Sequence, residues 1–218
     1  MKDPEIIYDE DDHKYMIKTE DDGLVEAPSV TTIMKEVGFY GRFVSKWEPD
    51  PDEIRFPEPP SEQEKKRDAA AKRGTAVHLM TEDLDRGHPL PEMIDEEIFP
   101  YIKAYLKFQE ENDLEIHEIE NIVFNDEFWY AGRVDRIMTI NGTPSIVDIK
   151  TGQVLDTTGL QLAAYLYAYQ KMEGEIKLER FALHLKNNGT YKLVAYKNNE
   201  DLNNFLAAVR VFHYKESL

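Results

Sequence analysis

The chain has 218 residues, of which 41% are hydrophobic and 32% are charged, and its formal net charge is −17. This composition predicts one globular domain with a sizeable core and no membrane-spanning segment. The absence of cysteine excludes disulfides, Fe–S clusters and thiolate zinc sites. The acidic start of the chain does not resemble a signal peptide, so we expect a cytoplasmic setting.

The first 60 residues predict small, irregular elements and carry 16 acidic but only 7 basic residues. A short hairpin is expected over residues 5–18, turning in the acidic stretch Asp9–Asp12. Ser29 is a plausible N-cap for a short helix that ends near Val37. The proline-rich, acidic stretch Trp47–Pro60 is typical of an irregular surface loop or a mobile flap.

Residues 61–218 predict a mixed sheet flanked by helices, which is an α/β architecture. Ser61 and Glu64 form a capping box, so a helix should begin there, run to about residue 85 and end at Gly87. Pro91 suits the first turn of a second helix, which should reach about Asn112. The remaining expected elements are strands at 115–124, 129–140 and 144–151, a helix at 157–172, a hairpin of strands 177–186 and 190–197, and a helix from about Asn199 onward.

The pair Asn141-Gly142 predicts a tight turn between two β-prone runs, because both residues tolerate positive φ. With a two-residue loop, the facing residue numbers sum to 283, so Asp135 should face Asp148 with Cβ atoms about 5 Å apart. Lys150 should project from the same face as Asp148. By the same register Arg133 should face Lys150, which indicates either a nearby phosphate or a solvated strand end.

Two facing carboxylates repel each other and need a compensating charge. A divalent metal ion is the natural candidate, since Mg²⁺ is usually held by one or two carboxylates, water and substrate phosphate. The alternative is a solvated outer face with two chance aspartates. The apolar and β-branched residues of both runs favour the metal site over this alternative.

The motifs of the chain resemble those of the PD-(D/E)xK nuclease superfamily. GRVDRI, VDIKTG and QLAAY are similar to its catalytic core, and RGTAVHLMTE resembles the upstream motif of the RecB-like branch. PSVTTI resembles the N-terminal region of phage exonucleases of that branch. The resemblance implies a restriction-endonuclease-like fold, in one domain over residues 1–218 whose catalytic core is residues 61–218.

The resemblance also implies roles for individual residues. Asp135 and Asp148 would bind Mg²⁺ or Mn²⁺, together with His78 and the backbone carbonyl of Ile149, and Lys150 would act on the attacking water and the transition-state charge. Glu82, which shares a helix face with His78, would bind a second metal ion or hold His78. The residues expected to contact DNA or to hold the catalytic groups are Gln161, Tyr165, Arg73 and Arg133.

Taken alone, several of these residues have simpler explanations. His78 could be a partly buried histidine without a ligand, Glu82 and Arg73 could be solvated helix residues, and Tyr165 could belong to the core. The ordered set of motifs favours the functional interpretation.

The resemblance predicts a metal-dependent DNA exonuclease acting on single strands or duplex ends. It also implies a phage or prophage origin, and a possible recombination or replication protein as partner. An RNA or structure-specific nuclease is a weaker option. The alternative is a non-catalytic protein on a nuclease fold, whose acidic surface binds a basic partner or mimics DNA. The sequence predicts neither digestion polarity nor oligomeric state.

Overall fold

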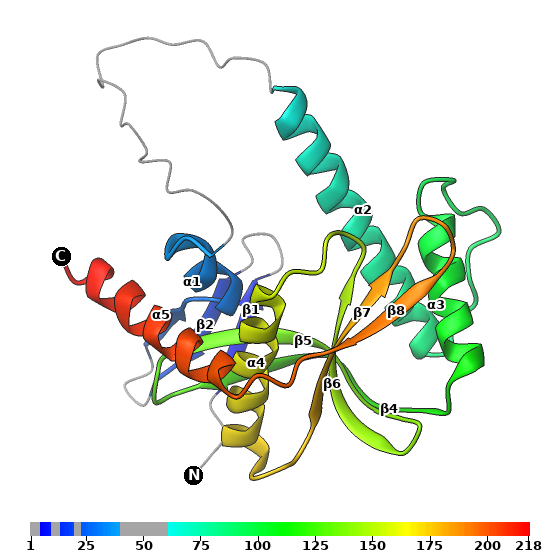
Figure 1. The fold of residues 1–218 in the computed structure, drawn as a ribbon. Helices are drawn as coiled ribbons and strands as arrows, with labels where there is room; N and C mark the ends of the chain where they lie inside the picture. The colour runs from blue at the N-terminus through cyan, green and yellow to red at the C-terminus, as the bar shows by residue number, and fades with distance from the viewer. Residues whose placement is uncertain (1–4, 10–13, 20–22, 40–60) are drawn as a thin grey trace.

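The computed structural model describes residues 5–9, 14–19, 23–39 and 61–218 (Figure 1). The helices within these residues are α1 (Val30–Glu36), α2 (Glu62–Asp85), α3 (Phe99–Glu111), α4 (Thr157–Glu173) and α5 (Glu200–Glu216). The strands are β1 (Ile6–Asp9), β2 (Lys14–Lys18), β3 (Leu24–Ala27), β4 (Leu114–Asn125), β5 (Tyr130–Ile140), β6 (Thr143–Lys150), β7 (Glu179–Leu185) and β8 (Tyr191–Ala195). None of the described helices is long and apolar enough to cross a membrane.

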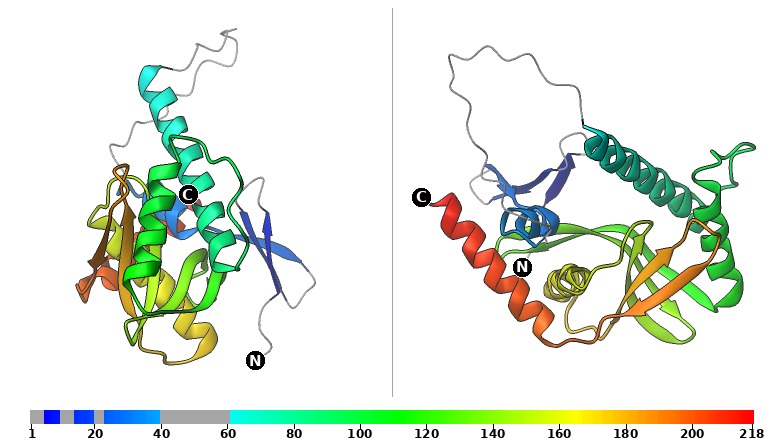
Figure 2. Two further views of the ribbon diagram at one scale, coloured as in Figure 1. Left: turned by 90° about the vertical axis from the view of Figure 1, so that its right-hand side faces the viewer. Right: turned by 45° about the horizontal axis from the view of Figure 1, so that its top comes forward.

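The main sheet has five strands in the order β4-β5-β6-β7-β8. All neighbours are antiparallel except β6 and β7, which are parallel because α4 crosses over between them. One buried core joins α1, α4 and α5 to one face of the sheet, and a second core joins α2 and α3 to the other face (Figures 1 and 2). The predicted class, a mixed α/β sheet flanked by helices, is confirmed.

A second, smaller sheet packs beside β5 at the N-terminal end of the chain. Its strands are antiparallel in the order β1-β2-β3. Tyr15, Ile17 and Ala27 form a small core with Phe124 and Ala131 of the main sheet. The hairpin predicted over residues 5–18 is present, whereas β3 was not predicted, since it is short and its first three residues are exposed.

The helix predicted to begin at Pro91 begins instead at Phe99. The reason is Pro100, which lies in the first turn of α3. Proline lacks a backbone N–H and clashes with the preceding turn, so it is tolerated where a helix starts but not in its interior. The predicted capping box of α2 is confirmed, with Ser61 and Glu64 bonded reciprocally. The predicted loop Trp47–Pro60 lies outside the described residues.

The β5–β6 hairpin has the predicted turn and register. Asn141 and Gly142 have φ values of 49° and 78°, as a tight turn of this hand requires. The paired residues run from Ile140 with Thr143 to Arg136 with Val147. The ladder ends one pair before Asp135 and Asp148, so these two aspartates lie where the strands begin to separate.

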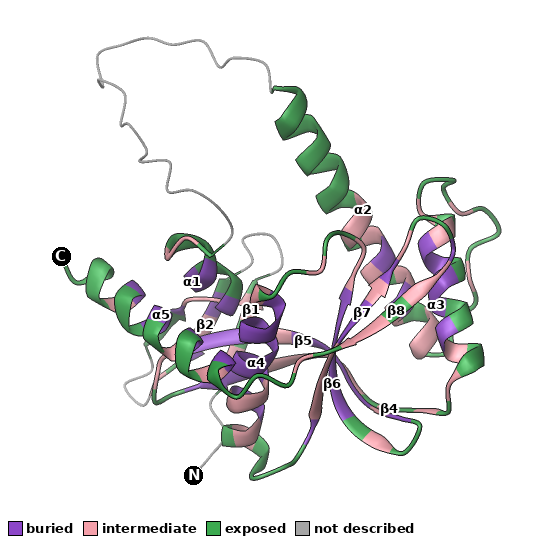
Figure 3. Ribbon diagram, in the orientation of Figure 1, coloured by how far each residue is buried: buried purple, intermediate pink, exposed green. Residues whose placement is uncertain are grey.

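Burial is uneven along the helices (Figure 3). α4 is buried along most of its length, whereas residues 61–72, at the start of α2, are exposed on all sides. The first buried side chain of α2 is Val77. The next residue is His78, so α2 reaches the sheet where its histidine lies.

Candidate metal centre

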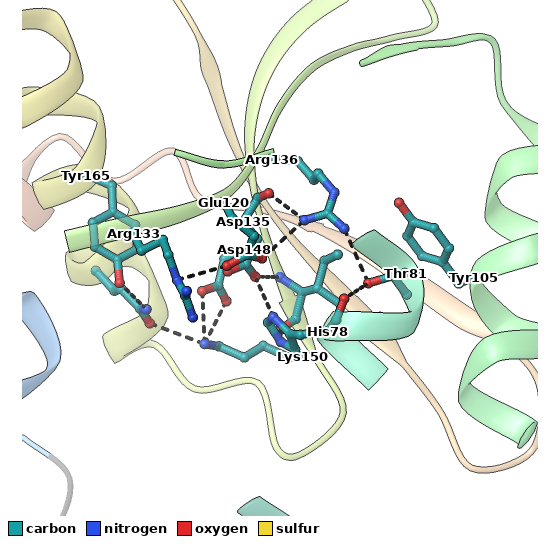
Figure 4. A network of polar contacts seen from close by, with 12 residues as sticks. His78, Thr81, Tyr105, Glu120, Arg133, Asp135, Arg136, Asp148, Lys150 and Tyr165 are labelled. Carbon is teal, nitrogen blue, oxygen red and sulfur yellow. Dashed lines mark hydrogen bonds and ion pairs between the residues drawn. The ribbon is translucent and has the colours of Figure 1, made fainter. Parts of the chain in front are cut away.

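Three side chains from three different elements converge beside the end of the β5–β6 ladder (Figure 4). They are His78 of α2, Glu120 of β4 and Asp135 of β5, and one ligand atom from each lies within 4.8 Å of the others. Asp135 is only 9% exposed, and the other two residues are half-buried. An imidazole and two carboxylates this close together form a donor set that suits a divalent cation.

The hydrogen bonds of His78 leave one ring nitrogen facing a carboxylate. Its Nε2 lies 2.9 Å from the backbone oxygen of Ile149. Because a carbonyl oxygen can only accept, Nε2 carries the proton. Nδ1 then points its lone pair at Oδ2 of Asp135, 3.6 Å away. Two acceptors that face each other in this way suit a metal ion between them.

Asp135 is fixed by the backbone of the neighbouring strand. Its Oδ2 accepts a hydrogen bond of 2.6 Å from the backbone N–H of Ile149. This side-chain bond takes the place of a further backbone bond where β5 and β6 separate. The peptide of Ile149 therefore holds Asp135 through its N–H and His78 through its oxygen, which aligns the two side chains.

Asp148 and Lys150 form a partly buried ion pair next to this cluster. The Lys150 Nζ lies 3.0 Å from Oδ1 and 2.8 Å from Oδ2 of Asp148. Asp148 is 3% exposed, and its burial raises the pKa of its carboxyl, while the charge of Lys150 opposes this rise. Oδ2 is buried, and the Lys150 ammonium faces it at ion-pair distance without hydrogen-bond geometry. A buried oxygen of this kind is a suitable metal ligand, so the residues present fit a divalent ion.

α4 completes the surroundings of Lys150. Gln161 accepts a hydrogen bond of 3.3 Å from Lys150 Nζ and donates one of 3.0 Å to the hydroxyl of Tyr165. Both α4 residues are buried, and burial raises the pKa of Tyr165. The structure thus brings Asp148, Lys150, Gln161 and Tyr165 together in one chain of polar contacts.

Glu120 was missed by the sequence analysis. It lies between the pairs Ile119–Arg136 and Asn121–Val134, so it faces Asp135 across the strands, and its φ is +51°. A positive φ is uncommon outside glycine. A register shift between Ile116 and Glu118 breaks the alternation of the strand. This irregularity is local to the folded sheet, so no regular period could identify Glu120.

The charge of Glu120 is balanced by two arginines. Arg133 Nε lies 2.9 Å from its Oε2, and an Arg136 nitrogen lies 3.3 Å from its Oε1. Burial raises the pKa of Glu120 most, and the charge of Asp135 raises it further. Among the groups that lower this pKa, Arg133 has the largest effect. The predicted facing of Arg133 and Lys150 is not observed, because the β5–β6 ladder ends at Arg136 and Val147 and the Arg133 side chain turns to Glu120.

Arg136 ties α2 to the sheet behind the cluster. Its fully buried guanidinium contacts Asp85 at 2.5 Å and donates to the backbone oxygen of Asp135 at 2.6 Å. Asp85 also accepts a hydrogen bond of 2.5 Å from Tyr105 of α3. Breaking a buried pair of this kind leaves an uncompensated charge, so separating α2 from the sheet at this point is unfavourable. His78 is therefore held at a defined place relative to Asp135.

The other predicted residues lie around the cluster. Glu82 contacts Arg86 at 2.8 Å, and both line a cavity of about 690 Å³ together with His78, Glu120 and Arg133. The guanidinium of Arg133 lies 4.9 Å from the ring centre of Tyr8. Arg73 packs over the ring of Tyr101 at 5.5 Å. Of the predicted residues on α2, only His78 belongs to the cluster with Asp135.

The family model of the PD-(D/E)XK nuclease superfamily matches residues 92–212, which is more than half of the chain. The matched range contains Glu120, Asp135, Asp148 and Lys150, whereas His78 precedes it. No curated protein matches the chain.

Proposed function

Because the chain belongs to the PD-(D/E)XK nuclease superfamily, we propose that it is a metal-dependent DNA exonuclease of phage or prophage origin, acting on single strands or duplex ends. The observation that carries this proposal is the convergence of His78, Glu120 and Asp135 within 4.8 Å. The ion pair of Asp148 and Lys150 lies beside them. The exonuclease assignment is supported by the His78 motif on α2, which resembles that of the RecB-like branch.

The proposed metal ligands are His78, Glu120, Asp135 and the buried Oδ2 of Asp148. A divalent ion held by them would supply Lewis-acid activation of water and of the scissile phosphate. The candidates are Mg²⁺ and Mn²⁺, and the imidazole of His78 shifts the preference toward Mn²⁺. Ile149 serves this site through its peptide, which aligns His78 and Asp135.

Lys150 is the proposed catalytic cation. Its ammonium is placed by Asp148 and Gln161, so it can orient the attacking water and stabilise the negative charge that develops on the phosphate. The attacking water loses a proton as its oxygen bonds to phosphorus, the bond from phosphorus to the sugar oxygen breaks, and the leaving oxygen takes up a proton from solvent. Gln161 and Tyr165 keep the lysine in position from α4.

The test is hydrolysis of end-labelled linear DNA in Mg²⁺ or Mn²⁺, compared with circular single strands. Wild type should degrade linear DNA and spare circles. Asp135→Asn and Lys150→Ala should each lower the rate on the order of 10²–10³-fold. Asp126→Asn and Lys177→Ala, at exposed positions, are the matched controls. Equal rates in Lys150→Ala and wild type would overturn the assignment, and cleavage of circles would replace exonuclease by endonuclease.

The net charge of −17 favours a second candidate, an acidic protein that binds a basic partner or mimics DNA. It predicts no hydrolysis of DNA or RNA with any divalent metal. It also predicts a stoichiometric complex with a basic protein that Asp135→Asn and Lys150→Ala leave intact. The complete set of Asp135, Asp148 and Lys150 makes the nuclease the better supported of the two.

A further inference from the structure

The last two strands of the sheet are basic in an acidic chain. Residues 180–199 contain four Lys or Arg residues and no Asp or Glu, although the whole chain has a net charge of −17. These residues include β8, the turn before it and all of β7 except its first residue, Glu179. The hairpin lies at one end of the main sheet, next to α3 (Figures 1 and 2). A local basic surface of this kind is what an acidic chain needs to hold a polyanion.

The register of the sheet places two lysines and a histidine in a row across three strands. Lys150 of β6 pairs with His184 of β7, and His184 pairs with Lys192 of β8. Residues paired in this way project from the same face of a sheet, and neighbouring strands lie about 4.8 Å apart. The row therefore runs from the proposed catalytic lysine to the edge of the sheet, where Lys192 is exposed.

Two cavities lie along this row and share a wall made of Gln153 and His184. One has a volume of about 650 Å³ and is also lined by Lys192 and Lys197. The other has a volume of about 380 Å³ and is also lined by Lys186, with Thr151 and Gly152, which follow Lys150 directly. We call the two together the hairpin groove. It lies beside the carboxyl ends of the parallel strands β6 and β7, where open α/β sheets commonly bind ligands.

The charges around the hairpin groove are mostly positive. Two acidic residues line it, Asp156 and Asp201. Asp201 is buried, and Arg180 offsets its charge at 3.0 Å, so Asp156 is the main negative charge facing the groove. Burial lowers the pKa of His184, and the charges of Lys186 and Lys192 lower it further. A positive potential therefore already acts at the middle of the groove.

Arg73 of α2 lies behind one wall of the second cavity. Its guanidinium packs over the ring of Tyr101, which lines that cavity. Its Nε is buried and has no hydrogen-bond partner among the residues that the structure describes. The Arg73 cation therefore adds to the positive potential near the second cavity.

We propose that the hairpin groove binds the sugar-phosphate backbone of a single nucleic-acid strand whose scissile phosphate lies at Lys150. This proposal rests on the proposed nuclease function. The cavities hold a few hundred Å³ each, which suits a single strand rather than a duplex. Lysine provides a point charge, which suits contacts to phosphates that do not depend on base sequence.

The test measures how the binding of a fluorescein-labelled 20-residue oligothymidylate depends on KCl concentration, with Ca²⁺ as the divalent ion. Lys192→Gln combined with Lys197→Gln removes two exposed cations from the groove. If both meet phosphates, the slope of log K against log[salt] should become less steep by about 1.4, since each contact to a single strand contributes about 0.7. The matched control is Lys107→Gln with Lys177→Gln, which changes the net charge equally at exposed sites outside the groove.

A reduced slope in the groove variant alone supports the proposal. An unchanged slope, an equal reduction in both variants, or no binding by wild type overturns it. Lys192→Arg with Lys197→Arg should keep the slope of wild type, which separates lost charge from damaged folding. Hydrolysis by wild type is measured separately. Failure of the proposed binding groove and failure of the nuclease assignment therefore give different results.

Discussion

Glu120 is held in a backbone conformation that few glutamates adopt. Its φ of +51° is costly for a residue with a side chain, and it faces Asp135 at close range. Both Arg133 and Arg136 contact its carboxylate. Backbone strain of this kind is found mostly at functional sites. The position of Glu120 between two arginines and a second carboxylate is therefore consistent with a metal ligand.

We predict that Glu120→Gln weakens Mn²⁺ binding by at least tenfold, because it removes a charged ligand while keeping the shape of the side chain. Titration followed by electron paramagnetic resonance of free Mn²⁺ measures the affinity. Glu115→Gln, on the same strand but exposed, removes the same charge away from the cluster and should bind like wild type. Equal affinities in both variants would remove Glu120 from the proposed ligands.

At the scale of elements, the site depends on how closely α4 approaches β5. Gly132 of β5 lies under the ring of Tyr165, and a Cβ atom at this position would overlap ring carbons of that tyrosine. Tyr165 contacts Gln161, which contacts Lys150. The absence of a side chain at residue 132 thus lets the helix hold Lys150, the proposed catalytic lysine, in place.

Gly132→Ala should therefore displace the Tyr165 ring and cost about 1–3 kcal/mol of unfolding free energy, as overpacking in a core does. We expect the nuclease rate to fall as well, through the contact of Gln161 with Lys150. Urea unfolding and the rate of DNA hydrolysis are the two measurements. Gly152→Ala is the control for stability, since a Cβ there meets nothing within 4 Å. A fully stable, fully active Gly132→Ala variant would contradict this account of α4.

Local signals predicted the elements that carry most of the site. Asn141-Gly142 fixed the register of the β5–β6 hairpin, and with it the neighbourhood of Asp135, because the turn geometry depends on two residues alone. Ser61 and Glu64 likewise marked the start of α2. The start of α3 was misplaced because Pro91 and Pro100 both suit a first helical turn, and only Pro100 occupies one.

Contacts between distant segments could not be predicted in the same way. Arg136 meets Asp85 across 51 positions of sequence, and Glu120 reaches His78 only through a local irregularity of β4. Neither the spacing of these residues in the sequence nor the hydrophobic pattern predicts such a contact. The resemblance to the nuclease superfamily supplied His78, since a single histidine on a helix has no distinguishing pattern of its own.

At the scale of the whole molecule, the acidic chain gathers carboxylates at a largely buried site. Burial raises the pKa values of both Glu120 and Asp148. A carboxyl whose pKa is higher in the folded state stabilises the fold at low pH, and this contribution is lost as the pH rises through the raised value. At neutral pH the metal-free protein therefore carries an unfavourable contribution from these groups, which a bound cation would offset.

We predict that Mn²⁺ stabilises the fold because its proposed ligands come together only there. At a concentration of about 100 times Kd, a ligand specific for the folded state adds about 2.7 kcal/mol. For a chain of this size that should raise Tm by roughly 5–10 °C. Differential scanning calorimetry at pH 7.5 measures the shift, with NaCl of equal ionic strength as the control for screening. Asp135→Asn should lose most of the shift, whereas Asp126→Asn, at an exposed turn, should keep it. An equal rise of Tm in NaCl, or in Asp135→Asn, would assign the effect to general screening of the −17 charge rather than to a metal centre.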